Sequence, residues 1–260
     1  KRKVAEVSPQ AREKIIMNLV NNAMIQGQPR RAAFAKKHGI NPPNHVVISP
    51  TMICDLKCFG CYAWQYSKKN DLPYDVCNRI IDEANAMGIY FFVITGGEPF
   101  MWDHLYDFLE RHNDSFFQIY TNGQHIDEEV AKKLAELGNA VPCISLEGFK
   151  DATDARRGEG AWDRIMNAYD VLRKHGVIYG FSITATSKNS ELIVSDEFID
   201  LLVEKGVFVG WYFNYIPIGK EPDMSLMPTP EQRDYRRKRI LEIRRKKHMV
   251  VADFWNDGNL

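Results

Sequence analysis

The fold is decided where a short apolar run, Val46-Val47-Ile48, leads into the loop Cys54-Asp55-Leu56-Lys57-Cys58-Phe59-Gly60-Cys61-Tyr62. Three thiolates at this spacing can converge on one soft metal centre, because thiolates favour zinc, copper(I) or iron–sulfur clusters. A structural zinc site or a structural cubane needs four protein ligands, and no fourth cysteine is near. The loop therefore predicts a 4Fe–4S cluster with one iron open to an exogenous ligand. The alternative is three ordinary buried thiols.

Composition narrows the class of protein. The chain has 260 residues, 45% of them apolar, and a formal net charge of zero. This length suits one large domain with an appendage, and the balanced charge gives no support for nucleic-acid binding. Its longest apolar runs, such as Ile89 to Thr95, are far shorter than the ~20 residues of a membrane span. Three of the five cysteines cluster, which argues against a disulfide scaffold and favours the reducing cytoplasm.

From Val46 onward, apolar strands alternate with amphipathic helices. Strands are expected at 46–50, 89–95, 116–121, 141–147, 178–186 and 207–215, and helices at 73–87, 103–112, 127–137, 161–175, 196–205 and 229–247. Such alternation implies a parallel sheet with right-handed crossovers. We predict an α/β fold, a partial (β/α)6 barrel with an N-terminal helical extension. The expected division is 1–45 for the extension, 46–220 for the barrel, and 221–260 for a C-terminal helix and tail. Residues 250–255 are a candidate for one further strand.

The segment before the barrel has its own helical pattern. Ser8 can cap a helix over 8–25 that starts at Pro9, and Gly27 and Pro29 are expected to end it. A second short helix is expected over 30–38. Packing on the main domain is the expected role of this amphipathic segment, with membrane-surface contact, near Lys1-Arg2-Lys3, as the alternative. The basic run on the last helix, from Arg236 to His248, is expected to be a solvated face.

Polar motifs follow the predicted strands. Thr95-Gly96-Gly97-Glu98-Pro99 comes after the second strand, where paired glycines permit close backbone approach to a ligand. Tyr120-Thr121-Asn122-Gly123 ends the third strand. In the fourth, alternation places Cys143, Ser145 and Glu147 on one face. Ligands bind past the carboxyl ends of parallel strands, so these groups are expected to share one site.

Together, the cysteine motif with its aromatic Tyr62 and the Gly-Gly-Glu-Pro motif resemble the signature of radical S-adenosylmethionine (SAM) enzymes. The resemblance runs from about Val46 to about Gly219. It implies that Cys54, Cys58 and Cys61 hold the cluster and that the methionine end of SAM chelates the open iron. One electron from the cluster then cleaves a C–S bond and releases a 5′-deoxyadenosyl radical.

The resemblance also implies which residues surround SAM. The loop Gly96, Gly97, Glu98 and Pro99 holds the methionine amino group, and Thr121 and Asn122 border the cofactor. Ser145 faces the ribose or the carboxylate, and Arg157 pairs with the carboxylate. Ser182 and Thr184 bond ribose hydroxyls or substrate, and Ile216 ends the strand that lies along adenine. Relatives commonly have Ser-Leu-Asp-Gly where this chain has Ser-Leu-Glu-Gly, so Glu147 keeps a carboxylate on a longer side chain.

We therefore expect an enzyme that modifies an unidentified substrate, either a lipid or isoprenoid or a peptide. Electrons are expected from a donor such as flavodoxin or ferredoxin under anaerobic conditions. The alternative is a non-catalytic iron–sulfur or SAM-binding protein, an electron carrier or a sensor. A zinc-binding module has less support, because zinc wants a fourth ligand.

Overall fold

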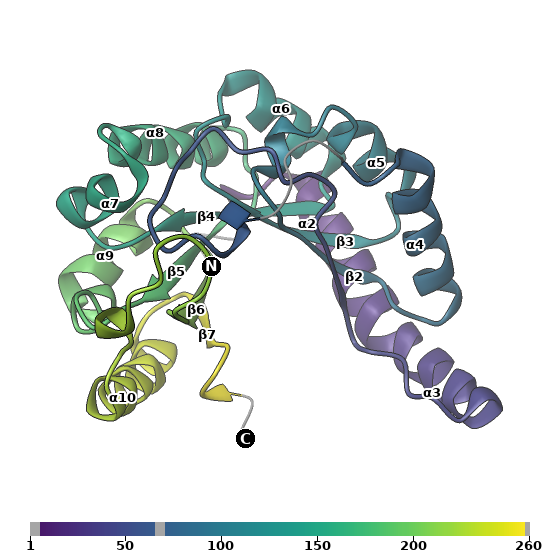
Figure 1. The fold of residues 1–260 in the computed structure, drawn as a ribbon. Helices are drawn as coiled ribbons and strands as arrows, with labels where there is room; N and C mark the ends of the chain where they lie inside the picture. Colours follow the sequence, from purple (N-terminus) through teal and green to yellow (C-terminus); the bar gives the residue numbers. More distant parts are fainter. Residues whose placement is uncertain (1–5, 66–70, 258–260) are drawn as a thin grey trace.

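A computed structural model of the chain describes residues 6–65 and 71–257, without the side chains of residues 64 and 65. Within these ranges the structure is an open half-barrel with helices on its convex side (Figure 1). The N-terminal Lys1-Arg2-Lys3 run lies outside the described residues.

All neighbouring strands of the sheet pair in parallel, in the order of the sequence, from β1 to β7. The strands are β1 (Val46–Ile48), β2 (Phe91–Ile94), β3 (Phe116–Thr121), β4 (Ala140–Leu146), β5 (Gly180–Ala185), β6 (Val209–Asn214) and β7 (Val250–Asp253). The partial parallel barrel is thus confirmed. The described residues contain seven strands, so the expected count of six was one short, and the candidate strand in the tail is real.

Helices connect successive strands, as right-handed crossovers require. They are α4 (Tyr74–Ala86), α5 (Leu105–Arg111), α6 (Glu128–Leu137), α7 (Lys150–Arg157), α8 (Ala161–Lys174), α9 (Asp196–Glu204) and α10 (Pro230–Lys246). Short 3₁₀ turns are η2 (Tyr62–Gln65), η3 (Pro99–Met101), η4 (Leu192–Val194) and η5 (Met224–Leu226). Helix α7 was not expected from the sequence, because its few apolar residues give no helical stripe.

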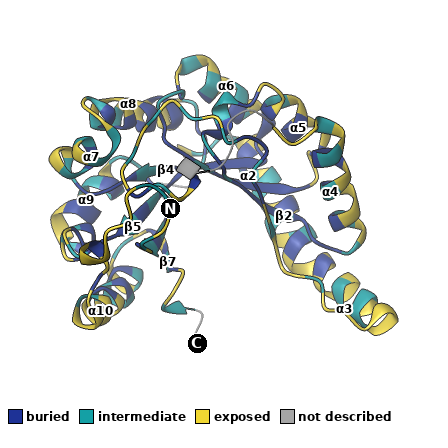
Figure 2. Cartoon of the chain, in the orientation of Figure 1, coloured by how far each residue is buried: buried dark blue, intermediate teal, exposed yellow. Residues whose placement is uncertain are grey.

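Two hydrophobic cores form on the two faces of the sheet, whose central strands are largely buried (Figure 2). The larger lies between the sheet and the helices, and includes Phe92 and Phe117, whose stacked ring centroids are 5.6 Å apart. The smaller lies inside the half-barrel around Phe116, Val141 and Cys143. Ile15 of the N-terminal segment packs there, which confirms that the extension packs on the barrel.

The N-terminal segment is one unbroken helix with three parts, α2 (Pro9–Ile15), η1 (Ile16–Gln26) and α3 (Gly27–His38). The Ser8 hydroxyl accepts from Ala11 N at 3.1 Å, as expected of the cap. The expected break at Gly27 and Pro29 was wrong. Gly27 has helical dihedrals, and Pro29 follows directly on the π-helical turns of η1, where the α-helical hydrogen-bond ladder is already interrupted.

One member of the basic run on α10 is wholly buried, so the expected solvated face was wrong at Arg236. Its Nε lies 3.2 Å from the Asp253 carboxylate of β7, and its Nη2 donates to Asn214 of β6. This buried pair ties α10 and the edge strand β7 to the sheet.

Replacing Arg236 by alanine should lower the free energy of unfolding by about 3–5 kcal/mol, because the buried Asp253 carboxylate loses its cationic partner. The matched control is Arg237→Ala on the exposed side of α10, which should change it by less than about 0.5 kcal/mol. Urea unfolding measures both. Equal losses for the two variants would contradict a structural role of the buried pair.

Candidate active site

The three clustered cysteines follow β1 in a stretch without regular secondary structure, at the carboxyl edge of the sheet. Cys54, Cys58 and Cys61 are free and half-buried. Burial raises the pKa of the Cys54 thiol to about 11. Burial also raises the pKa of the Cys58 thiol, and the charges of Arg157 and Arg156 oppose this rise. Two guanidinium groups therefore lie close enough to favour the thiolate form.

The Gly-Gly-Glu-Pro loop after β2 docks on the chain just before Cys54. Gly97 N donates to Thr51 O at 2.9 Å, and Glu98 N donates to Ile53 O at 2.7 Å. A Cβ atom on Gly96 or Gly97 would overlap the carbonyl oxygens of Thr51 or Ile53. The paired glycines are thus required by contact between two segments of the protein's own backbone, in addition to any ligand.

Glu98 is fully buried and links this loop to the turn after β3. Its carboxylate accepts from Thr121 Oγ1 at 2.7 Å, from Asn122 N at 2.6 Å and from Phe100 N at 3.0 Å. Burial raises the pKa of this carboxyl, and the three hydrogen bonds oppose the rise. Both oxygens serve the fold, so contact of Glu98 with an ammonium group stays a prediction. Pro99 is buried at the start of η3.

The turn after β3 also holds the cysteine loop. Asn122 Nδ2 donates to Asp55 Oδ1 at 2.8 Å and lies 3.9 Å from Cys54 Sγ. His125 Nε2 lies 3.2 Å from the other oxygen of Asp55. The roles of Asp55 and His125 were missed from the sequence, because nothing local links residues so far apart.

The segment after β6 also forms backbone hydrogen bonds with the cysteine loop. Gly60 N donates to Lys220 O, and Lys220 N donates to Cys61 O, both at 3.2 Å. A Cβ on Gly219 would overlap the Cys61 carbonyl oxygen. Ile216 is exposed nearby in the same segment, and the Tyr62 hydroxyl lies 3.2 Å from Thr95 Oγ1.

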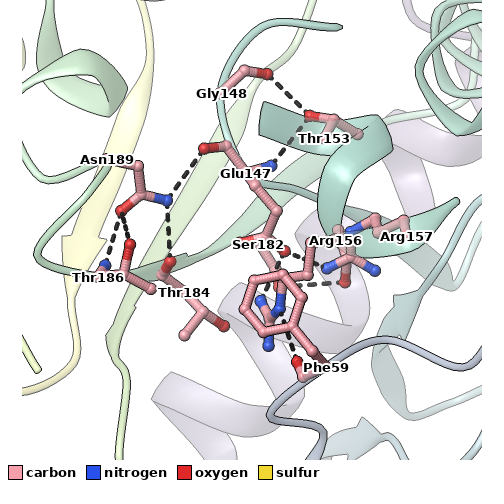
Figure 3. Close-up of polar contacts among 11 residues, drawn as sticks. Phe59, Glu147, Gly148, Thr153, Arg156, Arg157, Ser182, Thr184, Thr186 and Asn189 are labelled. Carbon is pink, nitrogen blue, oxygen red and sulfur yellow. Dashed lines mark hydrogen bonds and ion pairs between the residues drawn. The ribbon is translucent and has the colours of Figure 1, made fainter. Parts of the chain in front are cut away.

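Glu147 lies just past β4 and is nearly fully buried between two arginines of α7 (Figure 3). Its Oε1 lies 2.7 Å from Arg156 Nη1 and 2.6 Å from Arg157 Nη2. Arg156 Nε also donates to Phe59 O at 3.3 Å, inside the cysteine loop. Burial lowers the pKa of Arg157, but the charges of Glu147, Cys58 and Cys61 and the hydrogen bond to Glu147 together leave it raised. Glu147 therefore joins α7 to the end of β4, and Arg156 extends this contact to the cysteine loop.

Thr153 is buried next to this ion-pair cluster. Its hydroxyl accepts from Glu147 N at 3.2 Å and donates to Gly148 O at 3.0 Å. Asn189 holds the same turn by donating to Glu147 O at 3.0 Å and to Thr184 O at 3.2 Å (Figure 3). Asn189 was not predicted as a site residue, because its partners are backbone carbonyls on other strands.

Further polar groups face the interior of the half-barrel. Ser145 and Ser182 are register partners on β4 and β5, with hydroxyl oxygens 3.4 Å apart, so these two predicted residues meet. An aromatic contact spans the interior near them, since Tyr120 and Phe213 have ring centroids 5.6 Å apart. Trp211 stands beside Ser182 in the β5–β6 register.

Four buried polar atoms at this end of the barrel lack a hydrogen-bond partner among the described residues: Glu147 Oε2, Arg157 Nε, Trp211 Nε1 and His125 Nε2, which only approaches Asp55. Buried polar groups normally have partners, so these atoms can serve as donors and acceptors to a polar ligand. An acceptor beside a cationic donor suits a ligand that carries both an amino and a carboxylate group, as the methionine end of SAM does. The residues present thus fit this cofactor.

No three His, Cys, Asp or Glu side chains within 6–65 and 71–257 converge to hold a single metal ion. The donor set on the cysteine loop is three thiols, which suits an iron–sulfur cluster, whose irons take separate ligands.

Comparison with known proteins decides the family. The family model described as the Radical SAM superfamily matches residues 48–191, more than half of the chain. The chain belongs to the radical SAM superfamily. The matched range contains all three cysteines, the Gly-Gly-Glu-Pro loop and the Glu147–Arg157 pair.

Two curated radical SAM relatives are each 30% identical to this chain. One is Fe-coproporphyrin III synthase of Methanosarcina barkeri, over 213 residues, 78% of this chain and 52% of that protein. The other is mycofactocin maturase MftC of Mycolicibacterium smegmatis, over 205 residues, 75% of this chain and 51% of that protein. The chain thus spans about half the length of these relatives.

The radical SAM half-barrel also resembles solved structures. Streptococcus suis SuiB bound to S-adenosylmethionine aligns with a TM-score of 0.69 at 23% identity, over 88% of this chain and 54% of that one. Methylornithine synthase (PylB) aligns with a TM-score of 0.64 at 11% identity, over 93% of this chain and 73% of that one. At these identities the likeness confirms the partial-barrel fold.

Replacing Glu98 by glutamine should destabilise the protein by about 1–3 kcal/mol, because an amide cannot accept from all three donors. The folded-state pKa of Glu98 is raised, so the folded protein binds its proton more tightly than the unfolded chain. The contribution of Glu98 to the free energy of unfolding of the wild type is therefore complete below its pKa in the unfolded chain. It is lost as the pH rises through its pKa in the folded protein. The deficit of the variant should therefore be larger at pH 5 than at pH 8 in urea unfolding, and a deficit that grows with pH would contradict this assignment.

Proposed function

We propose that this radical SAM chain holds a 4Fe–4S cluster on Cys54, Cys58 and Cys61 and binds S-adenosylmethionine beside it. The observation that carries the proposal is the convergence of four segments, after β2, β3, β4 and β6, on one three-thiol loop. When bound, the cluster supplies the electron that cleaves S-adenosylmethionine to methionine and a 5′-deoxyadenosyl radical. The radical then modifies a substrate.

The chain's own residues have separable roles in this proposal. Arg157 offers its free Nε to the methionine carboxylate, and Glu147 Oε2 accepts from the amino group or a ribose hydroxyl. Ser145, Ser182 and Thr184 line the sheet beside them, where ribose or substrate hydroxyls can bond. The Gly96–Pro99 loop, Thr121, Asn122, Tyr62 and Ile216 complete the cofactor site as the sequence predicts.

The barrel interior is the proposed substrate site. Tyr120, Trp211 and Phe213 give it an aromatic wall, and the Trp211 indole offers one unpaired donor among the described residues. We favour a peptide substrate, because MftC is a maturase and SuiB has been solved bound to the precursor peptide SuiA. A lipid or isoprenoid is the second candidate, favoured by the apolar wall. We place the reaction in the reducing cytoplasm with flavodoxin or ferredoxin as donor.

The competing proposal is a non-catalytic electron carrier or sensor with the same cluster. Release of 5′-deoxyadenosine distinguishes the two, since a carrier or sensor leaves S-adenosylmethionine intact.

Anaerobic reconstitution should load about four irons on each chain, and dithionite with S-adenosylmethionine should then release 5′-deoxyadenosine, followed by mass spectrometry. Cys58→Ala should lose most of the iron and all cleavage. Cys77→Ala, on the helical side of the sheet, is the control and should keep both. If the Cys58 variant still cleaves S-adenosylmethionine, the cluster assignment is wrong.

Arg157→Ala in the reconstituted protein should weaken binding of S-adenosylmethionine by about tenfold or more, because a charge-assisted hydrogen bond contributes about 1.5–3 kcal/mol. Arg156→Ala should weaken binding less, because the Arg156 Nε already donates to Phe59 O. Equilibrium binding with iron content matched between the two variants checks this. If wild type and Arg157→Ala bind S-adenosylmethionine with equal affinity, Arg157 does not contact the cofactor.

A further inference from the structure

The middle of the N-terminal helix has an unusual winding. Residues Ile16–Gln26 form a π-helix, in which each N–H bonds five residues back, and Gly27 N still bonds to Asn22 O. Such helices are rare, occur mostly as single turns and are frequent at functional sites. Because the turn is wider than an α-helical turn, residues four and five apart stack on the same side.

The inward side of η1 combines apolar packing of Leu19 on the smaller core with amide hydrogen bonds. Asn18 Nδ2 donates to Asn113 O and to Ser115 O, both at 2.9 Å. Asn22 Nδ2 donates to Asp114 O at 2.8 Å. These partners lie just before β3, so η1 runs along the amino edge of the sheet, opposite the cysteine loop.

The outward side of η1 is apolar and exposed. The exposed fractions are 59% for Ile16, 46% for Met17, 40% for Val20, 57% for Met24 and 59% for Ile25. Ile16, Val20, Met24 and Ile25 are spaced by four or five residues, so the π winding gathers them on one side. Single exposed apolar side chains are normal, whereas a contiguous group marks an interaction surface. We call these five residues the η1 apolar face.

Along the chain, the segment that carries the η1 apolar face has charge of one sign, and the exposed Asp114 lies beside Asn22 on its inward side. Between Glu13 and Asp55 the sequence has no acidic residue and five basic ones, Lys14, Arg30, Arg31, Lys36 and Lys37. Four of them lie on α3, which projects away from the barrel (Figure 1). Arg30, Lys36 and Lys37 are exposed.

We propose that η1 and α3 together dock the protein on an anionic lipid surface. The η1 apolar face would enter the boundary between headgroups and acyl chains, while the exposed Lys36 and Lys37 contact acidic headgroups. Arg30 and Arg31 already donate to Tyr90 and Gly88 of the barrel. A second copy fits this surface less well, because it would bring two segments of like charge together. No described helix is long and apolar enough to cross a bilayer, so the contact is peripheral. The cysteine loop lies at the opposite edge of the sheet and stays accessible.

Co-sedimentation with vesicles tests this proposal without any cofactor. The protein should bind vesicles of phosphatidylcholine with phosphatidylglycerol, should bind phosphatidylcholine alone far more weakly, and should be released by high salt. The triple variant Ile16→Ser, Val20→Ser, Met24→Ser should partition at least about tenfold less. Lys36→Gln with Lys37→Gln should lower partitioning about fivefold for each charge removed.

The matched control is Met224→Ser with Met227→Ser, which removes two exposed apolar side chains at η5 and should bind as wild type does. Thermal unfolding of each variant verifies that it is folded, and the Lys36 and Lys37 pair tests the surface independently of the apolar changes. The proposal is overturned if the wild-type protein does not co-sediment with anionic vesicles. A triple variant that binds normally also overturns it, as does one that converts a dimer to a monomer in sedimentation velocity without vesicles.

Discussion

The buried carboxylate of Glu98 is the interaction on which the site depends. The carboxylate is fully buried and accepts hydrogen bonds from the backbone and a side chain of the turn after β3. The backbone N–H of Glu98 donates to the Ile53 carbonyl, beside the first cysteine. One residue therefore fixes the relative positions of three segments that the sequence separates widely. Burying a carboxylate costs free energy unless its oxygens accept hydrogen bonds, and here donors of the protein supply those bonds. The neighbouring glycines cannot carry side chains, because a Cβ there would overlap the Thr51 and Ile53 carbonyl oxygens.

The cysteine loop itself has little regular structure, so its shape comes from its neighbours. Asn122 and His125 hold Asp55, Arg156 holds Phe59, and Gly60 and Cys61 pair with Lys220. Short loops held by many neighbours keep ligands in place before a metal centre arrives, which preorganises the thiols. The positive charge of the two arginines near Cys58 adds an electrostatic contribution in the same direction.

Sequence patterns predicted most of the fold and much of the site. Strand and helix positions followed from periodicity, and Ser145 and Ser182 met as alternation along parallel strands requires. The errors share one origin, which is that local propensity cannot represent tertiary partners. Gly27 and Pro29 stay helical because η1 is bonded along the sheet edge, and Arg236 is buried because Asp253 neutralises it.

By itself, the sequence determined the cysteine spacing, the glycine–carboxylate loop and the alternation of strands with helices, because each depends on neighbours a few residues away. Only the tertiary structure decided that Glu147 joins two arginines, that Asn189 supports its turn, and that Arg157 Nε is left unpaired among the described residues. It also decided that a π-helical winding turns an amphipathic helix into an exposed apolar face beside a basic arm. These contacts join residues that are far apart in the chain. Sequence patterns do not show them, because hydrogen bonding and desolvation depend on how close groups lie in space.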